Sequence, residues 1–501
     1  MVSAYIELNP SPLVQFLQKP MKDFTKEDLI RFIREYGVEM INFRYVGGDG
    51  RLKTLNFVIS SREYLDSVLS TGERVDGSSL FSHIEAGSSD LYVVPRYGTA
   101  FLNPFTEVPT LELLCSYFDK DGNPLASAPE QTLIKARQSL ISETGFDLDA
   151  MGELEYYVIG EKEALYPARD QKGYHESGPF AKYEYLRTEA MQYIAQAGGV
   201  IKYGHSEVGN FVSGNKYFEQ NEIEFLPTDI RNAADQMIIA KWIIRMLGYK
   251  YGAEVSFAPK ITVGKAGSGL HIHMRLMKDG KSVMIRNGIL SDEARKAIAG
   301  ILNVSPALCA FGNTIPTSFL RLVPHQEAPT SICWGDRNRS VLVRVPLGWS
   351  GKASQMIRLA NPQDLFDLSD HSGKQTVEFR GPDGSADIYL LLAGLTVAVR
   401  HGIQMPDALE LAEKLYVDVN IFHDEHRSKC DELDKLPNSC WETANQLLKH
   451  RSVFEAHKVF SPGLIDNLAE RLKQYGDKDL SEKLFQKNEE VREFVEKFLH
   501  C

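Results

Sequence analysis

Four short segments of this chain carry reactive side chains two residues apart, with one apolar residue between them. Successive residues of a strand point to opposite faces of a sheet, so each pair would lie on one polar face. A single pair is also typical of a half-exposed sheet with solvated glutamates, but four pairs favour a shared site. The pairs are Glu153 with Glu155, Glu222 with Glu224, His271 with His273, and Glu378 with Arg380.

A site built from such pairs would hold several carboxylates close together. Close carboxylates repel one another and raise one another's pKa unless cations neutralise them. Oxygen ligands with one or two imidazoles suit Mg²⁺ or Mn²⁺ better than zinc. If the polar faces converge, we therefore predict a site for two or more divalent cations, Mg²⁺ or Mn²⁺.

Arginines supply the opposite charge in the same half of the chain. Guanidinium groups match phosphate and carboxylate oxygens, although structural ion pairs explain such arginines about as well. Metals together with arginines suit phosphoryl transfer from a triphosphate, which requires neutralisation of charge. The glycine loop at 264–269 is not a P-loop, because no Gly-Lys-Ser/Thr closes it. The arginines are Arg321, Arg337, Arg339, Arg344, Arg358 and Arg380.

The region ahead of residue 125 is predicted to be a small unit rich in strands. A helix opens at Thr25, and a β-hairpin surrounds the turn Gly47-Gly48-Asp49-Gly50. Further strands are expected at 91–94 and 111–117, and a helix beginning near Ala128 opens a longer mixed region. The predicted divisions are an N-terminal extension at 1–23, a small domain at 24–124 and a large domain at 125–501.

The two ends of the chain are predicted to differ. Three prolines within 1–23 favour an arm, which we expect to contact another subunit. At the other end, Ser461 caps a helix with Pro462 in its first turn and leucines at every fourth residue. The charged tail at 477–501 is expected to form a peripheral helix.

The composition is that of an ordinary globular protein with an acidic balance. A net charge of −11 argues against a general nucleic-acid binder, which needs a basic surface. The longest apolar stretch, from Ile388 to Val399, is too short to span a bilayer, and the first residues show no signal-peptide pattern. Six scattered cysteines without a CxxC pair suit a reducing cytosol, so we expect a cytoplasmic protein.

Longer motifs occur in a fixed order along nearly the whole chain. They are Asp76-Gly77-Ser78-Ser79, Gly152-Glu153-Leu154-Glu155-Tyr156, Glu207-Val208, Gln220-Asn221-Glu222-Ile223, Ala258-Pro259-Lys260, Gly267-Ser268-Gly269-Leu270-His271-Ile272-His273, Arg321-Leu322-Val323-Pro324, Glu327-Ala328-Pro329, Asn338-Arg339-Ser340, Arg344-Val345-Pro346 and Glu378-Phe379-Arg380-Gly381-Pro382-Asp383. Each motif alone is short, but the ordered set is specific. In this ordered set of motifs, the chain resembles the glutamine synthetase family, nearest the bacterial type I enzymes.

The resemblance implies an α+β fold. In this family a small N-terminal β-grasp domain precedes a large catalytic domain whose antiparallel sheet lines the active site, in agreement with a boundary near residue 125. The resemblance also implies a homo-oligomer of stacked rings with active sites between neighbouring subunits. Asp76 would then act in the active site of the neighbouring subunit.

The resemblance assigns roles to residues by position. One metal ion would bind Glu155, Glu207 and Glu222, and the other would bind Glu153, His271 and Glu378. Phosphates of ATP would contact His273, Arg339 and Arg344, and Arg380 would lie near the transferred phosphoryl group. Arg321 and Gly267 would bind the amino-acid substrate. Asp76 would help to bind ammonium and take its proton, and Glu327 would lie on a closing flap.

The implied reaction is the ATP-dependent ligation of ammonia to the γ-carboxylate of L-glutamate through γ-glutamyl phosphate. Two alternatives stay open: a γ-glutamyl ligase that uses another amine, such as a polyamine or an ethanolamine-like compound, and a non-catalytic structural relative. Ala266 stands where ammonia-using members carry asparagine, and Arg275 replaces a small hydroxyl residue near the nucleotide. An inserted turn is expected between Glu207 and Glu222. These departures leave the implied metal ligands intact, so the activation of glutamate is the firmer half of the prediction.

Overall fold

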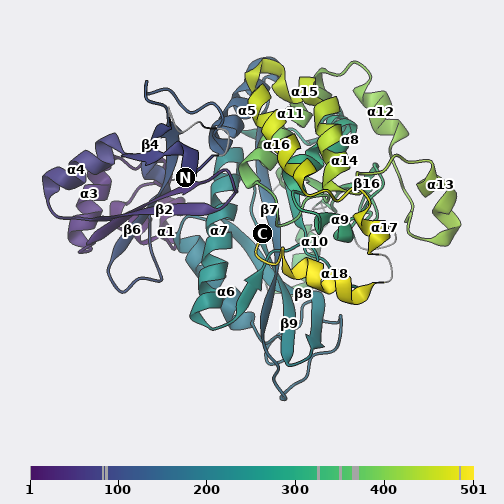
Figure 1. Ribbon diagram of the computed structural model, residues 1–501, viewed down its shortest axis with the longest axis horizontal. Helices are drawn as coiled ribbons and strands as arrows, with labels where there is room; N and C mark the ends of the chain where they lie inside the picture. The colour runs from purple at the N-terminus through teal and green to yellow at the C-terminus, as the bar shows by residue number, and fades with distance from the viewer. Residues whose placement is uncertain are drawn as a thin grey trace.

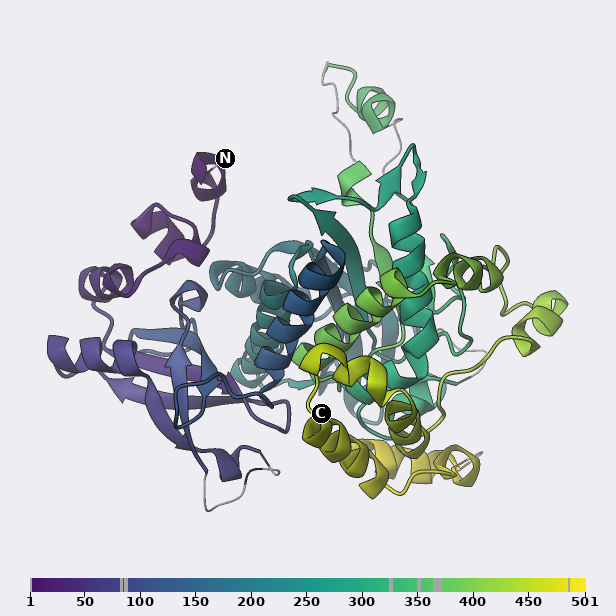
Figure 2. The ribbon, with the colours of Figure 1, turned by 90° about the horizontal axis from the view of Figure 1, so that it is seen from above.

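The computed structural model places a small domain beside a large one (Figure 1). It describes residues 2–81, 84, 89–323, 328–348, 353–363, 372–484 and 487–501. The purple small domain and the larger teal, green and yellow domain lie side by side in both views (Figures 1 and 2). The α+β architecture predicted from the sequence is confirmed.

The N-terminal segment is helical and packs on the small domain. It forms α1 (Val2–Glu7), α2 (Pro12–Leu17) and the 3-10 turn η1 (Met21–Asp23). Leu13 and Val14 of α2 are fully buried in the small domain's hydrophobic core. The segment is therefore part of this core and not a detached arm, and its contact with another subunit stays a prediction.

The small domain is a mixed sheet covered by two helices. Its strand order is β2-β1-β6-β4-β3, with β1 parallel to β6. The short strand β5 also pairs with β6, in the antiparallel direction. The predicted hairpin is confirmed as β1 paired with β2, and the predicted helix is confirmed with a capping box of Thr25 and Asp28. The elements are α3 (Lys26–Glu35), β1 (Met40–Val46), β2 (Leu52–Val58), α4 (Arg62–Thr71), β3 (Glu73–Asp76), η2 (Gly77–Ser79), β4 (Asp90–Pro95), η4 (Tyr97–Thr99), β5 (Phe101–Leu102) and β6 (Thr110–Phe118).

The large domain is built on a second sheet with β7 near its centre. The strand order is β16-β17-β18-β12-β7-β9-β8, and all these neighbours are antiparallel except β16 with β17. The strands are β7 (Asp147–Glu161), β8 (Ile201–Ser213), β9 (Lys216–Phe225), β10 (Thr228–Asp229), β11 (Glu254–Ser256), β12 (Leu270–Lys278), β13 (Lys281–Ser282), β14 (Ile285–Arg286), β15 (Ile289–Leu290), β16 (Trp334–Asp336), β17 (Val343–Val345) and β18 (Val377–Phe379).

Helices cover one face of the large sheet and leave the other face to polar side chains. Leu154 and Tyr156 of β7 are fully buried in the large hydrophobic core. Between them and α7 (Ile230–Lys250) the packing is tight, because a Cβ at Gly152 would lie 2.3 Å from the sulfur of Met237. By strand alternation, the intervening residues of β7 face away from α7.

The helix α11 lies in the interior of the large domain, and its residues are almost all buried. It packs against α5 and α8, and α14 packs against α16. The helices predicted from 128 to 144 and after Ser461 are confirmed as α5 and α16. The helices are α5 (Pro129–Thr144), α6 (Glu184–Gln196), α8 (Asp292–Gly312), α9 (Ser318–Arg321), α10 (Ala353–Ala360), α11 (Ile388–Gln404), α12 (Ala408–Lys414), α13 (Arg427–Asp431), α14 (Cys440–Lys449), α15 (Arg451–Glu455), α16 (Pro462–Gln474), α17 (Leu480–Lys483) and α18 (Asn488–Glu496), with 3-10 turns η5 (Ser372–Lys374), η6 (Asp424–His426) and η7 (Ala456–Lys458).

Within the described residues, no single helix has both the length and the hydropathy of a membrane span. The pair α11 and α12 passes that test only jointly, and a bend of 108° separates its two members. The apolar stretch in α11 is buried in the hydrophobic core, which explains its composition.

Buried polar contacts join the two domains. Arg96 of the small domain donates to Asp235 of α7 at 2.6 and 2.9 Å, and Tyr389 of α11 donates to the same carboxylate at 2.6 Å. The guanidinium of Arg44 lies 4.6 Å from the ring centre of Trp242. Because these groups are buried or half-buried, they fix how the small domain sits on α7.

Candidate active site

Neighbouring strands of the large sheet bring the four predicted pairs onto one face. The strands are consecutive in the sheet, in the order β18, β12, β7 and β9, so their polar residues form adjacent rows. Such rows place side chains from distant parts of the chain within contact distance. The opposed positions are Glu153 with Glu224 and with His271, Glu155 with Glu222, and His273 with Glu378.

Three groups of side chains on this face have the donors and spacing of metal sites. Within each group, one ligand atom of every residue lies within 4.8 Å of the others. Carboxylate oxygens with one imidazole are a donor set that Mn²⁺ and Mg²⁺ accept. The groups are Glu153, His271 and Glu378; His205, Glu207 and Glu222; and Glu153, Glu224 and His273.

The first group contains the three ligands that the family resemblance assigns to one metal ion. His271 Nδ1 lies 2.8 Å from Glu153 Oε2 and 3.6 Å from Glu378 Oε1. His273 contacts the other oxygen of Glu153, since its Nε2 lies 2.8 Å from Oε1. Glu153 therefore stands between two imidazoles, which links the first group to the third.

The second group differs from the implied one, because His205 takes the place expected for Glu155. His205 Nε2 lies 3.8 Å from Glu222 Oε2. Glu155 instead accepts hydrogen bonds from Gly269 N at 2.8 Å and Gln220 Nε2 at 3.1 Å. Glu155 belongs to none of the three groups among the described residues, although its Oε1 is 3.9 Å from His271 Nε2.

Glu224 belongs to one of the four pairs but has no implied role, and His205 is not among the residues predicted for the site. Both had a signal in the sequence. His205-Ser206-Glu207 repeats the spacing of two residues found in the other pairs, and Glu224 is the partner of Glu222 in its pair. The polar residue between His205 and Glu207 hid the pattern, because Ser206 is not apolar yet is buried.

The electrostatics of the face favour bound cations. Burial raises the pKa of Glu222 well above its usual value, and the charges of Glu153, Glu155, Glu207 and Glu224 raise it further. All four of these neighbours are acidic, so none of them stabilises the ionised form of Glu222. A bound cation would therefore stabilise that ionised form.

Imidazoles reverse this effect at the other end of the face. Burial pushes the pKa of Glu153 up, but the neighbouring His273 and His271 outweigh it and hold that pKa well below its usual value. Burial also lowers the pKa of His205, which favours the neutral imidazole. Neutral imidazole is the form that binds metals.

Two of the predicted arginines bracket the first group. Arg344 Nη1 and Arg380 Nε each lie 2.9 Å from an oxygen of Glu378. Arg380 also donates to the carbonyl oxygen of Arg339, whose own side chain is exposed. This arrangement puts guanidinium groups next to Glu378, where a phosphate would meet both metal ligand and arginine.

Arg321 and Gly267 also lie at the site. Arg321 is 5% exposed, and its Nη2 lies 3.5 Å from His271 Nε2. A Cβ at Gly267 would lie 2.6 Å from the carbonyl oxygen of Pro259 and 3.0 Å from Arg321 Cγ. Only glycine lets the loop pass this close to Arg321. The loop is held from outside by Lys265, which is 2.5 Å from Asp170.

Of the two residues implied for the amine site, the structure describes only Asp76. Asp76 ends β3 of the small domain and is exposed, and the hydroxyls of Ser79, Ser78 and Ser89 hold the pKa of its carboxyl well below its usual value. Glu327 lies outside the described residues. The placement of Asp76 leaves its role in a neighbouring subunit as a prediction.

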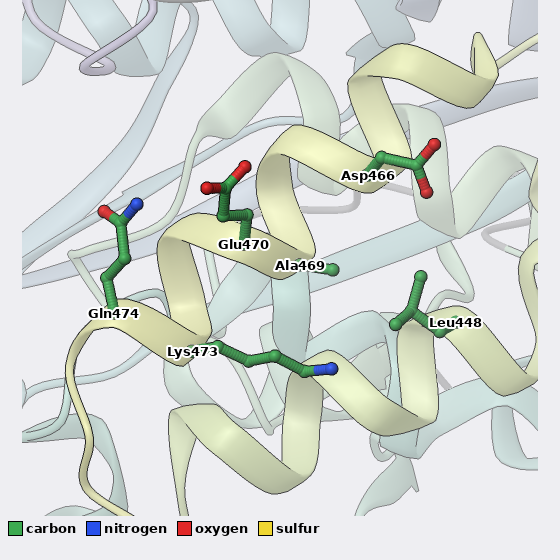
Figure 3. Close-up of a pocket in the computed structure, with 6 residues that line it drawn as sticks. All are labelled: Leu448, Asp466, Ala469, Glu470, Lys473 and Gln474. Atoms are coloured by element: carbon green, nitrogen blue, oxygen red, sulfur yellow. The ribbon is translucent and has the colours of Figure 1, made fainter.

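Two cavities of the protein lie away from the three groups. A cavity of about 400 Å³ lies between α14 and α16, lined by Asp466 and Lys473 among others (Figure 3). A second, of about 540 Å³, lies between the N-terminal segment and α7. Neither is lined by a member of the three groups, so the site is assigned from its side-chain chemistry.

The fold and the site define a two-domain α+β protein with clustered carboxylates and imidazoles on one sheet face. The sequence model of the glutamine synthetase catalytic domain matches residues 126–484, and that of the glutamine synthetase β-grasp domain matches residues 37–120. The chain therefore belongs to the glutamine synthetase family.

Relatives match over most of their length. The glutamine synthetase of Clostridium saccharobutylicum is 29% identical over 437 residues, which are 85% of this chain and 90% of that protein. That of Frankia alni is 30% identical, with 77% and 84% covered. That of Thermotoga maritima is 28% identical, with 91% and 96% covered.

Solved structures share the fold. The cryo-EM structure of Plasmodium falciparum glutamine synthetase has a TM-score of 0.73 at 19% identity, covering 92% of this chain and 97% of that one. The structure of apo GmaS has a TM-score of 0.70 at 17% identity, covering 90% and 96%. At these identities the likeness supports the fold alone.

Proposed function

We propose that this chain ligates ammonia to the γ-carboxylate of L-glutamate at the expense of ATP, giving glutamine, ADP and phosphate. The proposal rests mainly on one observation: acid–imidazole groups on adjacent strands lie against the guanidinium groups that bracket Glu378. Metal sites beside paired arginines suit the transfer of a phosphoryl group.

The residues of the chain divide the work of the reaction. Arg321 binds the α-carboxylate of glutamate and Gly267 leaves room for that substrate, while His273, Arg339 and Arg344 bind the phosphates of ATP. Arg380 faces the phosphoryl group of ATP that is transferred. Its transfer to the γ-carboxylate gives γ-glutamyl phosphate.

Mg²⁺ or Mn²⁺ held by the acid–imidazole groups would neutralise the phosphate charge. Asp76 of a neighbouring subunit and Glu327 bind ammonium and take its proton, because ammonium cannot attack before it is deprotonated. The reactive acyl phosphate requires a site closed to water, a role that we assign to the segment with Glu327. The action of Asp76 in a neighbouring subunit requires a homo-oligomer. We propose the stacked rings that the family resemblance implies, in a cytoplasmic enzyme.

The direct test is an assay of the purified protein with ATP, glutamate, ammonium and Mg²⁺ or Mn²⁺. We expect glutamine and phosphate in equal amounts, and loss of both in Glu378→Gln. Exposed Glu107→Gln is the matched control and should keep full activity. Phosphate release without glutamine would contradict the proposal.

A second candidate is a γ-glutamyl ligase for another amine. It stays open because Ala266 stands where ammonia-using members of the family carry asparagine. A panel of ammonium, methylamine, ethanolamine and spermidine, compared by kcat/KM with ATP and glutamate, decides between the two. If an organic amine were preferred over ammonium by two orders of magnitude or more, the assignment of glutamine formation would be wrong.

A non-catalytic structural relative is the remaining alternative. The acid–imidazole groups argue against this alternative, because a purely structural role does not require metal ligands. Calorimetry that measures ATP binding in the presence of Mn²⁺ or Mg²⁺ separates an enzyme from a structural protein. No binding with either ion would favour the structural role.

A further inference from the structure

His205 lies on the active-site face in the structure, although it is not among the residues that the sequence predicts for the site. It lies on β8, opposite Glu222 of β9 in the strand register, and shares the second group with Glu207 and Glu222. Its ring nitrogen Nε2 is the atom that faces the carboxylates, at 3.8 Å from Glu222 Oε2.

We propose that His205 is a nitrogen ligand of the second divalent metal ion, together with Glu207 and Glu222. This inference rests on the proposed function, because it concerns a metal ion of the same reaction. It changes the ligand set, since the family resemblance implies Glu155 with Glu207 and Glu222 at this ion.

The hydrogen bonding of His205 leaves one nitrogen available to a metal. His205 Nδ1 lies 3.1 Å from the carbonyl oxygen of Ser206. A carbonyl oxygen only accepts, so the proton must be on Nδ1, and Nε2 carries the lone pair. Histidines that bind metals commonly donate their other ring N–H to a backbone carbonyl, which fixes the tautomer and the ring orientation.

Neighbouring rings hold the imidazole in place. The ring of His175 lies 4.4 Å from that of His205, centre to centre, and Tyr174 contacts it edge-on at 5.4 Å. Both come from the segment after β7, which crosses the β8 backbone, where His175 N donates to the carbonyl of Ser206 at 2.9 Å. The ring is therefore oriented before any metal binds.

One buried guanidinium ties together the two strands that supply the ligands. Arg187 of α6 is 4% exposed, and its Nη1 donates to Ser206 Oγ at 3.0 Å and also to Asn221 Oδ1. Ser206 precedes Glu207, and Asn221 precedes Glu222. The β8–β9 register is irregular just beyond, between Ser206 and Asn210, so Arg187 fixes the spacing that the ladder itself does not.

Glu155 is engaged elsewhere. One of its oxygens, Oε2, accepts from both Gly269 and Gln220, and Gln220 also donates to the carbonyl of Gly267 at 2.9 Å. These bonds give Glu155 a role in holding the substrate loop. His205 thus supplies the third donor, and a nitrogen donor should shift the preference of this ion towards Mn²⁺ over Mg²⁺ relative to a site of oxygens alone.

The test is pulsed EPR of the full-length protein loaded with Mn²⁺, since imidazole nitrogen couples to bound Mn²⁺. We expect His205→Asn to lose one histidine nitrogen coupling relative to the wild type. The matched control is His423→Asn, which removes an exposed imidazole outside the three groups and should keep every coupling. Labelling histidine with ¹⁵N identifies the coupled nuclei as histidine nitrogens.

A Mn²⁺ titration provides the second readout. In His205→Asn, and in His205→Gln, we expect one site to weaken by roughly 10- to 100-fold while the other Mn²⁺ site keeps its affinity. The retained site and an unchanged circular dichroism spectrum report that the variants fold. If both variants kept every histidine nitrogen coupling, or bound Mn²⁺ with unchanged affinity, the inference about His205 would be wrong even if the wild type forms glutamine. If the wild type had no ligase activity, only the proposed function would be wrong.

Discussion

At the scale of residues, charge decides the behaviour of the active-site face. Glu222 is 7% exposed, and burial and four neighbouring carboxylates raise its pKa. Glu378, which is equally enclosed, has arginines on both sides. Burial raises the pKa of Glu378, but His273, Arg380 and His271 outweigh it, so its pKa is lowered. Two carboxylates on one face thus differ because of their immediate neighbours.

Glu222→Gln is expected to stabilise the metal-free protein at neutral pH. A carboxyl whose pKa is higher in the folded than in the unfolded state opposes folding as the pH rises above its unfolded pKa, near 4.5. We expect the Tm in EDTA at pH 7.5 to rise by roughly 1 °C, the shift that about 1 kcal/mol produces in a chain of this length. Calorimetric scans at pH 7.5 and pH 5 check this, because the difference should shrink at the lower pH.

With Mn²⁺ the order should reverse, since the variant lacks a ligand and gains less stability from the ion. Exposed Glu107→Gln should leave the Tm unchanged in both conditions. A lower Tm for Glu222→Gln than for the wild type in EDTA would show that the carboxylate repulsion is not the dominant effect.

At the scale of elements, the loop before β12 joins the two halves of the site. Gly269 donates its N–H to Glu155, and a Cβ there would lie 2.7 Å from both Arg321 Nη2 and His271 Nε2. Because His271, a proposed metal ligand, and Arg321, proposed to bind glutamate, both pack on this glycine, the loop sets their separation.

We expect Gly269→Ala to lower kcat/KM for glutamate by roughly 100-fold, the effect of displacing positioning groups by about 1 Å. The same variant should weaken Mn²⁺ at the site that contains His271. Steady-state kinetics and a Mn²⁺ titration measure the two effects. Gly463→Ala is the control, because a Cβ at Gly463 meets no atom within 4 Å; wild-type kinetics in Gly269→Ala would refute the tight approach.

At the scale of the whole molecule, the small domain is fixed to the large one, and the hydrogen-bond partners found for its Asp76 lie within the small domain. Arg96, Asp235 and Tyr389 hold the domains together. The partners of Asp76 are serines of its own domain, such as Ser78 and Ser79 at 2.7 Å. An active site completed by a neighbouring subunit accounts for both facts.

Mixing two inactive variants tests this arrangement. Asp76→Ala and Glu378→Gln, unfolded and refolded together in equal amounts, should regain about a quarter of the wild-type activity, because random assembly pairs intact halves that often in a cyclic oligomer. Each variant refolded alone is the control. If the mixture stayed as inactive as its components, Asp76 would act within its own chain or not at all.

Much of the fold and part of the site could be predicted from short stretches of sequence. The capping box at Thr25, the hairpin of β1 and β2, and α16 after Ser461 depend on residues close together in the chain. The membership of Glu153, His271 and Glu378 in one group came from the resemblance to a family. The packing of the N-terminal segment on the small domain could not be predicted from its own residues, because its burial depends on the distant core of that domain.

The sequence alone determined that paired acids and histidines would share strand faces, because side chains alternate with a period of two residues. Only the tertiary structure decided which pairs meet, since the register of β7 with β9 and β12 opposes residues far apart in the chain, such as Glu153 with Glu224 and with His271, and the register of the β8–β9 hairpin is irregular. That register brings His205 to the face and turns Glu155 towards Gly269. Local geometry therefore predicts which way a side chain points, whereas packing of the whole domain decides what it meets there.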